Sequence, residues 1–117
     1  DSHKVSQSID TPTGSYWHGI MHRREPDYSN GKYWFRQVGQ HPAFPGVRAA
    51  AAELTRDAPS HPTSDFLEAQ PTWDPFAFVD LVEKCATGQS PSGQLCRQIQ
   101  TAEWRILFDY CYRQAIA

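Results

Sequence analysis

The amino-acid sequence predicts an all-α protein, a small bundle of five or six helices that makes a single domain over residues 1–117. Three observations favour this fold. Apolar residues recur every three or four positions in several segments, no segment alternates apolar and polar residues as a half-buried strand does, and Pro, Gly and Asp separate the segments. A chain of 117 residues with 39% hydrophobic residues is an ordinary size for one domain.

The helical periodicity divides the chain into segments. Its main features are a helical hairpin at 15–38 and a long, central C-terminal helix. In order, the sequence predicts the end of a helix at 1–9, a break at 11–14, helices at 15–25, 28–38 and 45–58, a loop at 59–72 with one helical turn at 64–69, and helices at 75–86 and 92–116.

Capping residues and prolines mark the helix ends. Pro26 ends the first helix of the hairpin, and Asp27 is placed to cap the second, which Gly39 closes. Asp74 followed by Pro75 is typical of a helix start. The carboxylate accepts hydrogen bonds from the first turn, and Pro fits the first helical position because its missing N–H has no partner there.

The C-terminal helix carries two apolar stripes. Each stripe repeats at helical spacing, so we expect this helix to pack on both sides at the centre of the bundle. Trp73 and Trp104 are interpreted as core residues, and Glu103 as part of a hydrated helical face. The first stripe consists of Leu95, Ile99, Ala102, Ile106 and Tyr110, and the second of Trp104, Phe108, Cys111 and Ala115.

Composition and charge argue against several classes of protein. With 11 basic and 13 acidic residues the formal net charge is −2, which does not favour nucleic-acid binding. No apolar run approaches the roughly 20 residues that cross a bilayer, and the polar start at Asp1 is not a secretory signal. Three cysteines without a paired spacing favour a reducing, cytoplasmic setting over a disulfide framework. The lack of an initiator Met leaves open that the numbering starts inside a longer protein.

The densest group of potential metal ligands lies in the first hairpin helix. His18 and His22 are spaced i, i+4, so they share one helical face, and Glu25 lies one turn further on. These three side chains could bind a divalent metal ion, with His3 as a fourth ligand. Gly19 follows His18, so the HExxH arrangement of zinc proteases is absent. The alternative is one buried, hydrogen-bonded histidine beside an exposed one.

Cationic side chains near the hairpin turn favour a second chemistry. A small anionic or polar ligand could bind to Arg23, Arg24, Arg36 and Lys32, since a guanidinium fork fits a carboxylate or a phosphate. Tyr33 is expected to point its hydroxyl into the same cleft. The alternative is that the arginines pair with nearby carboxylates. Arg24 falls in the apolar arc of its helix, so we expect it to have a carboxylate partner if it is buried.

The helical hairpin resembles a tetratricopeptide hairpin. Gly19 and Gly31 stand at the small positions where such helices cross, Phe35 at the later aromatic position, and Pro42 near the closing proline. The resemblance implies the geometry of a hairpin. A second copy at the period of about 34 residues does not follow, and His22 stands where that motif has an aromatic residue. A peptide-binding groove is therefore not implied.

A longer stretch looks like a group of bacterial proteins of unknown function. The resemblance consists of YWHGIMHRREPDY at 16–28, YWFR at 33–36 and HP at 41–42, preceded by SH at 2–3 and SQSI at 6–9. It covers roughly the first 45 residues and is a hypothesis from motif matching. It implies no activity, cofactor or substrate.

Three classes of function follow from these patterns. The first, which we favour, is a ligand-binding helical domain with a small polar cleft. The second is an enzyme in which His18 or His22 acts as an acid–base group or a metal ligand. The third is an interaction module whose aromatic hairpin packs on a partner or forms a homodimer. The residues predicted to line the ligand site are His3, His18, His22, Arg23, Glu25, Tyr33 and Arg36.

Overall fold

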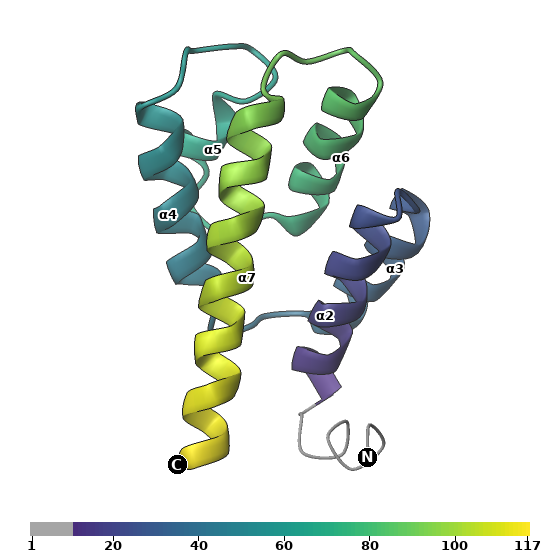
Figure 1. The fold of residues 1–117 in the computed structure, drawn as a ribbon, viewed down its shortest axis with the longest axis vertical. Helices are drawn as coiled ribbons and strands as arrows, with labels where there is room; N and C mark the ends of the chain where they lie inside the picture. The colour runs from purple at the N-terminus through teal and green to yellow at the C-terminus, as the bar shows by residue number, and fades with distance from the viewer. Residues whose placement is uncertain (1–10) are drawn as a thin grey trace.

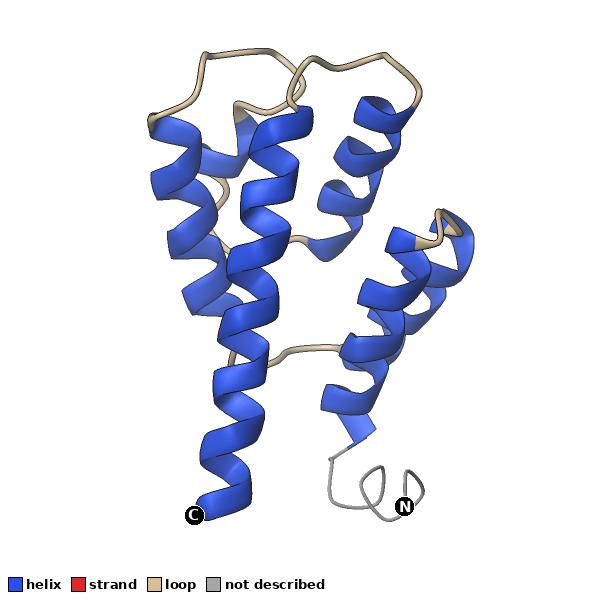
Figure 2. Ribbon diagram, in the orientation of Figure 1, coloured by secondary structure: helices blue, strands red, loops and turns tan. Residues whose placement is uncertain are grey.

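The computed structural model describes residues 11–117 and confirms the all-α fold over that range. Its helices are α2 (Thr11–Arg24), α3 (Tyr28–Val38), α4 (Phe44–Arg56), α5 (Phe66–Ala69), α6 (Pro75–Ala86) and α7 (Gly93–Ile116). Loops join them, and no β-strand occurs within residues 11–117 (Figure 2). The helix end predicted at 1–9 lies outside the described residues. Within the described part of the chain, no helix has both the length and the apolar character needed to span a membrane.

α7 runs along the length of the molecule, and the other helices are arranged around it (Figure 1). It packs against α4 and α6, α5 packs on α4, and the α2–α3 hairpin joins this body where α3 meets α6. The predicted central position of the C-terminal helix is confirmed. α2 reaches α7 mainly through long side chains rather than close backbone packing, and this spacing leaves room for the site described below.

The capping residues predicted for α3 and α6 are confirmed. Asp27 accepts a hydrogen bond from a backbone N–H in the first turn of α3 at 3.4 Å, and Asp74 accepts two from the first turn of α6 at 3.0 Å. Gly39 ends α3 with a φ of 65°, a conformation that glycine adopts without strain. Because each cap determines one helix boundary, the predicted limits of α3 and α6 match the observed ones.

The break predicted at 11–14 is wrong, because α2 begins at Thr11. Pro12 stands in the first turn, where the N–H that proline lacks would have no partner inside the helix. Gly14 is helical as well. The hydroxyl of the buried Thr13 lies 2.8 Å from Nε2 of His41, which ties the start of α2 to the connection between α3 and α4.

Small residues let α2 and α3 cross closely. A Cβ atom on Gly19 would lie 2.8 Å from the ring of Phe35, so no larger residue fits there without a shift. A Cβ atom on Gly31 would lie 3.5 Å from the backbone nitrogen of Arg23. The two glycines predicted to stand at the crossing are therefore found in close contact with the facing helix.

The core lies around α7 and is rich in aromatic side chains. The ring of Tyr16 packs edge to face on Phe35 at 5.8 Å and on Phe44 at 5.4 Å between centroids. Trp73 is 4% exposed, which confirms its place in the core. The buried cluster also includes Ile20, Val47, Leu67, Phe78, Leu81, Ile99 and Leu107.

Only one of the two predicted stripes of α7 is covered. Leu95 and Ile99 are buried, whereas Trp104 is 45% exposed and Phe108 is 52% exposed. The end of α7 that carries the C-terminus extends well past α4 in Figure 1. The Trp104 ring contacts Trp17 of α2 edge on, at 5.9 Å between centroids, and this contact leaves it partly exposed. The interpretation of Trp104 as a core residue, and of α7 as packed on both sides, is wrong for this half of the helix.

Candidate functional site

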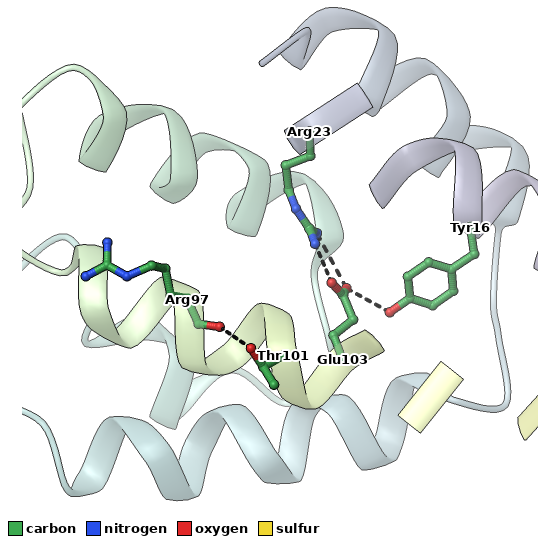
Figure 3. A network of polar contacts seen from close by, with 5 residues as sticks. All are labelled: Tyr16, Arg23, Arg97, Thr101 and Glu103. Carbon is green, nitrogen blue, oxygen red and sulfur yellow. Dashed lines mark hydrogen bonds and ion pairs between the residues drawn. The ribbon is translucent and has the colours of Figure 1, made fainter. Parts of the chain in front are cut away.

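A buried ion pair joins α2 to α7. Arg23 of α2 and Glu103 of α7 are 80 residues apart in the sequence, and both side chains are fully buried. The guanidinium donates to both carboxylate oxygens, from Nη2 to Oε1 and from Nη1 to Oε2 at 3.5 Å. The Tyr16 hydroxyl donates to Oε2 at 2.9 Å (Figure 3). The interpretation of Glu103 as a hydrated residue is therefore wrong.

The surroundings of Arg23 explain how the core accommodates a charged side chain. The guanidinium carbon lies 4.9 Å from the ring centroid of Phe78 and 5.8 Å from that of Phe35, so the cation contacts two aromatic rings. A buried charge is strongly destabilising unless it is paired, and Glu103 supplies the pairing. Nε of Arg23 has no hydrogen-bond partner among the described residues.

The Tyr16 hydroxyl is a fixed donor in this network. Burial raises the pKa of Tyr16 well above its ordinary value of 10.0, and the charge of Glu103 and the hydrogen bond to it act in the same direction. The charge of Arg23 acts in the opposite direction and is the smaller influence. Tyr16 therefore stays protonated, and the network holds side chains in position rather than exchanging protons.

A groove between α2 and α7 opens to solvent beside the ion pair. Its volume is about 430 Å³. Arg23 forms its buried part, and the accessible part carries three more arginines, Arg24 from α2 and Arg97 and Arg105 from α7. The remaining lining residues are Ile20, Gln100, Thr101 and Trp104.

The groove is basic although the whole chain is slightly acidic. Four of the eight arginines line it, and no Asp or Glu does. The guanidinium groups of Arg24, Arg97 and Arg105 form no ion pair or hydrogen bond with another residue in the range 11–117. Positive charge that no neighbouring carboxylate neutralises attracts anions. The groove is therefore suited to an anionic ligand.

The α7 side of the groove follows from helical spacing. Arg97, Thr101 and Arg105 are four residues apart, so their side chains share one face. Gln100 and Trp104 form the adjacent row on the same helix. The Thr101 hydroxyl donates to the backbone carbonyl of Arg97 at 3.0 Å (Figure 3), which leaves the guanidinium groups as the main donors in the groove.

The predicted histidine cluster lies on another face of α2. His18 stacks on Trp34 of α3 with ring centroids 4.3 Å apart, and the rings of His18 and His22 are 6.4 Å apart. Nδ1 of His22 lies 3.5 Å from a carboxylate oxygen of Glu25 and 3.8 Å from one of Asp27. His18, His22 and Glu25 thus follow one another along one side of the hairpin, as their spacing predicted.

This arrangement is not a preformed metal site. In the part of the chain that the structure describes, no group of three or more His, Cys, Asp or Glu side chains is placed to hold one ion. The His18 ring contacts Trp34, and the Glu25 side chain is 55% exposed. His3, the predicted fourth ligand, lies outside the described residues, so metal binding stays a prediction.

The other predicted ligand residues are spread over the surface of α3. Tyr33 is 45% exposed, contacts Trp34 edge on and does not line the groove between α2 and α7, so the expectation that its hydroxyl faces a cleft stays a prediction. Arg36 is exposed, and Lys32 pairs with Asp80 of α6 at 2.6 Å. Of the described cationic residues predicted to bind an anion, Arg23 and Arg24 line the arginine groove, whereas Arg36 and Lys32 do not.

The sequence interpretation missed the α7 half of the groove. Arg97 and Arg105 share a helical face, and this spacing was a signal that could have been used. A carboxylate partner was expected for Arg24 if its side chain is buried, whereas Arg24 is exposed and its neighbour Arg23 has that partner. Adjacent positions point in different directions on a helix, so an error of one residue exchanges a core side chain for a surface one.

No protein-family model, curated protein or solved structure matches the chain.

Proposed function

We propose that this protein binds a small organic anion, carrying a carboxylate or a phosphate group, in the groove between α2 and α7. The observation that carries the proposal is the set of three guanidinium groups, those of Arg24, Arg97 and Arg105, which line one groove and lack a carboxylate partner in residues 11–117. A guanidinium fork donates two parallel hydrogen bonds to a carboxylate or phosphate. An anion supplies the acceptors that these side chains lack.

The rest of the groove favours an organic ligand over a bare ion. Trp104 is 45% exposed and, with Ile20, provides an apolar wall beside the arginines. An aromatic or aliphatic part of a ligand that covers this wall is stabilised by the burial of apolar surface. A volume of about 430 Å³ is within the range of small-molecule sites.

The buried ion pair stabilises the buried part of the groove. Glu103 and Tyr16 hold the guanidinium of Arg23 in one position, so this wall of the groove does not depend on a ligand for its order. Because Glu103 neutralises Arg23, attraction of an anion relies on the three accessible arginines. Substitution of those arginines therefore removes the ligand site without breaking the core.

Calorimetric titration at low salt tests this proposal with three probes: inorganic phosphate, citrate and phenyl phosphate. We expect phenyl phosphate to bind more tightly than inorganic phosphate, because its ring can cover Trp104. The variant Arg97→Gln/Arg105→Gln is expected to bind phenyl phosphate at least about tenfold more weakly, since it loses two charged donors.

The matched control is Arg56→Gln/Lys84→Gln, which lowers the net charge equally at exposed positions outside the groove. It should bind phenyl phosphate as the unmodified protein does. Equal weakening in both variants would indicate non-specific attraction by net charge. That result, or the absence of binding for all three probes, would rule out the groove as an anion site.

A further inference from the structure

Two of the three cysteines meet where α6 packs on α7. The Sγ atoms of Cys85 and Cys96 are 3.5 Å apart, and both residues are free thiols. Cys96 is 3% exposed, while Cys85 is partly accessible. Cys111 has no sulfur atom beside it within residues 11–117. The chain therefore holds one dithiol and one separate thiol in its described part.

The contact between the two sulfur atoms is close to what a disulfide requires. An S–S bond is about 2.05 Å long, so the sulfur atoms have to approach by roughly 1.5 Å. Cys85 lies in the last turn of α6 and Cys96 in the first turn of α7. The loop at 87–92 joins these two turns, so the two cysteines stand at neighbouring helix ends.

We propose that Cys85 and Cys96 form a site of reversible oxidative modification, at which a peroxide converts the two thiols to an intramolecular disulfide. The proposal is independent of anion binding. It rests on the placement of two thiols, from different helices, in direct contact. Sequence spacing did not predict it, because the cysteines are 11 residues apart and form no CxxC motif.

The reaction takes two steps. The Cys85 thiolate attacks one oxygen of hydrogen peroxide, so that an S–O bond forms, the O–O bond breaks and the other oxygen leaves as water after protonation. The Cys96 sulfur then attacks the sulfur of the Cys85 sulfenic acid. An S–S bond forms, the S–O bond breaks, and the hydroxyl group leaves as water with the proton of Cys96. In total, two thiols lose two electrons and two protons, and one peroxide becomes two waters.

The surroundings of the two cysteines determine which one reacts first. Cys85 is the more accessible, so it meets the peroxide. Burial raises the pKa of Cys96, and the hydrogen bond with Cys85 acts in the same direction, so Cys96 does not compete as a thiolate. Arg23 and Arg97 act in the opposite direction. Their charge favours negative charge on the Cys96 sulfur as it gives up its proton.

Peptide mapping of the folded protein tests the proposal. The protein is treated with an equimolar amount of hydrogen peroxide, quenched, alkylated with iodoacetamide in denaturant and digested with trypsin. Cleavage after Lys84 and Arg97 leaves Cys85 and Cys96 on one peptide, 85–97, and Cys111 on another. We expect peptide 85–97 to be unalkylated and lighter by two hydrogen atoms than the same peptide with two free thiols. Cys111 should be alkylated. Dithiothreitol should restore the alkylation of both cysteines.

Two variants and one condition sharpen the result. Cys111→Ser should still form the bond, whereas Cys85→Ser should leave Cys96 alkylated. Oxidation in denaturing urea should weaken the preference for the Cys85–Cys96 pair, because unfolding separates the two sulfur atoms. If Cys85→Ser does not fold, the mapping of the unmodified chain decides alone. A bond to Cys111, a cross-link between two copies of peptide 85–97, or Cys85 oxidised to sulfinic acid beside a reduced Cys96 would overturn the proposal.

Discussion

The two faces of α2 carry similar polar residues but differ in what surrounds them. On the inner face, Tyr16 and Arg23 are buried and meet Glu103 of α7. On the outer face, His18 is exposed and stacks on Trp34 of the neighbouring helix. The inner contacts join residues 80 or more positions apart, whereas the outer contacts stay within the hairpin.

This difference shows which polar residues the fold depends on. A buried charge that loses its partner remains out of water, and breaking such a pair costs about 3–5 kcal/mol. An exposed pair contributes about 0–1 kcal/mol, because water replaces the lost partner. Residue type alone does not separate the two cases. The position of a side chain relative to the core separates them. Substitutions on the two faces should therefore change the free energy of unfolding by different amounts.

Removal of Arg23 should have the largest effect. We expect Arg23→Met to lower the free energy of unfolding by about 3–5 kcal/mol, because the carboxylate of Glu103 stays buried without its cation. Urea denaturation, monitored by circular dichroism, measures the change in the free energy of unfolding. The double variant Arg23→Met/Glu103→Gln should recover most of the loss, since Gln is neutral and keeps an acceptor for Tyr16. A loss below about 1 kcal/mol for the single variant would contradict the burial of this pair.

Substitution of Gly19 tests the tight side of α2 at its crossing with α3. We expect Gly19→Ala to cost about 1–3 kcal/mol, because the new Cβ would lie 2.8 Å from the Phe35 ring. Gly14 is the matched control in the same helix, because no atom from another element of residues 11–117 lies within 4 Å of its would-be Cβ. Gly14→Ala should stabilise the protein by up to about 1 kcal/mol through helix propensity. Thermal unfolding of the two variants measures both changes in stability. A gain in stability for both would show that the crossing of α2 and α3 is loosely packed.

The sequence predicted most of the fold, because helix ends are determined locally. Asp27, Gly39 and Asp74 act on residues within one turn, so their chemistry can be read without knowledge of the tertiary structure. The start of α2 was missed because Pro12 and Gly14 together resemble a loop, whereas both are tolerated in the first turn of a helix.

The candidate site could be predicted only in part, because its two sides come from distant segments. Arg23 was identified as a ligand residue, but its partner Glu103 is 80 residues away. Periodicity shows which residues share a helix face and does not show what that face packs against. Trp104 illustrates the limit: its stripe is as apolar as the one through Ile99, yet its ring meets α2 only at Trp17 and stays 45% exposed.

Substitutions on the outer face of α2 should change the free energy of unfolding least. We expect His18→Ala/His22→Ala, in the presence of a chelator, to alter the free energy of unfolding by less than about 1 kcal/mol, because both contacts are local and partly hydrated. Repeating the melts with added zinc tests the metal prediction on the same variant. If zinc stabilises the unmodified chain and not the variant, His18 and His22 bind the ion, since a ligand stabilises the state that binds it. The outer face would then be a second functional site rather than a hydrated surface. If the unmodified chain unfolds at the same temperature with and without zinc, the arginine groove remains the site that the geometry of α2 supports.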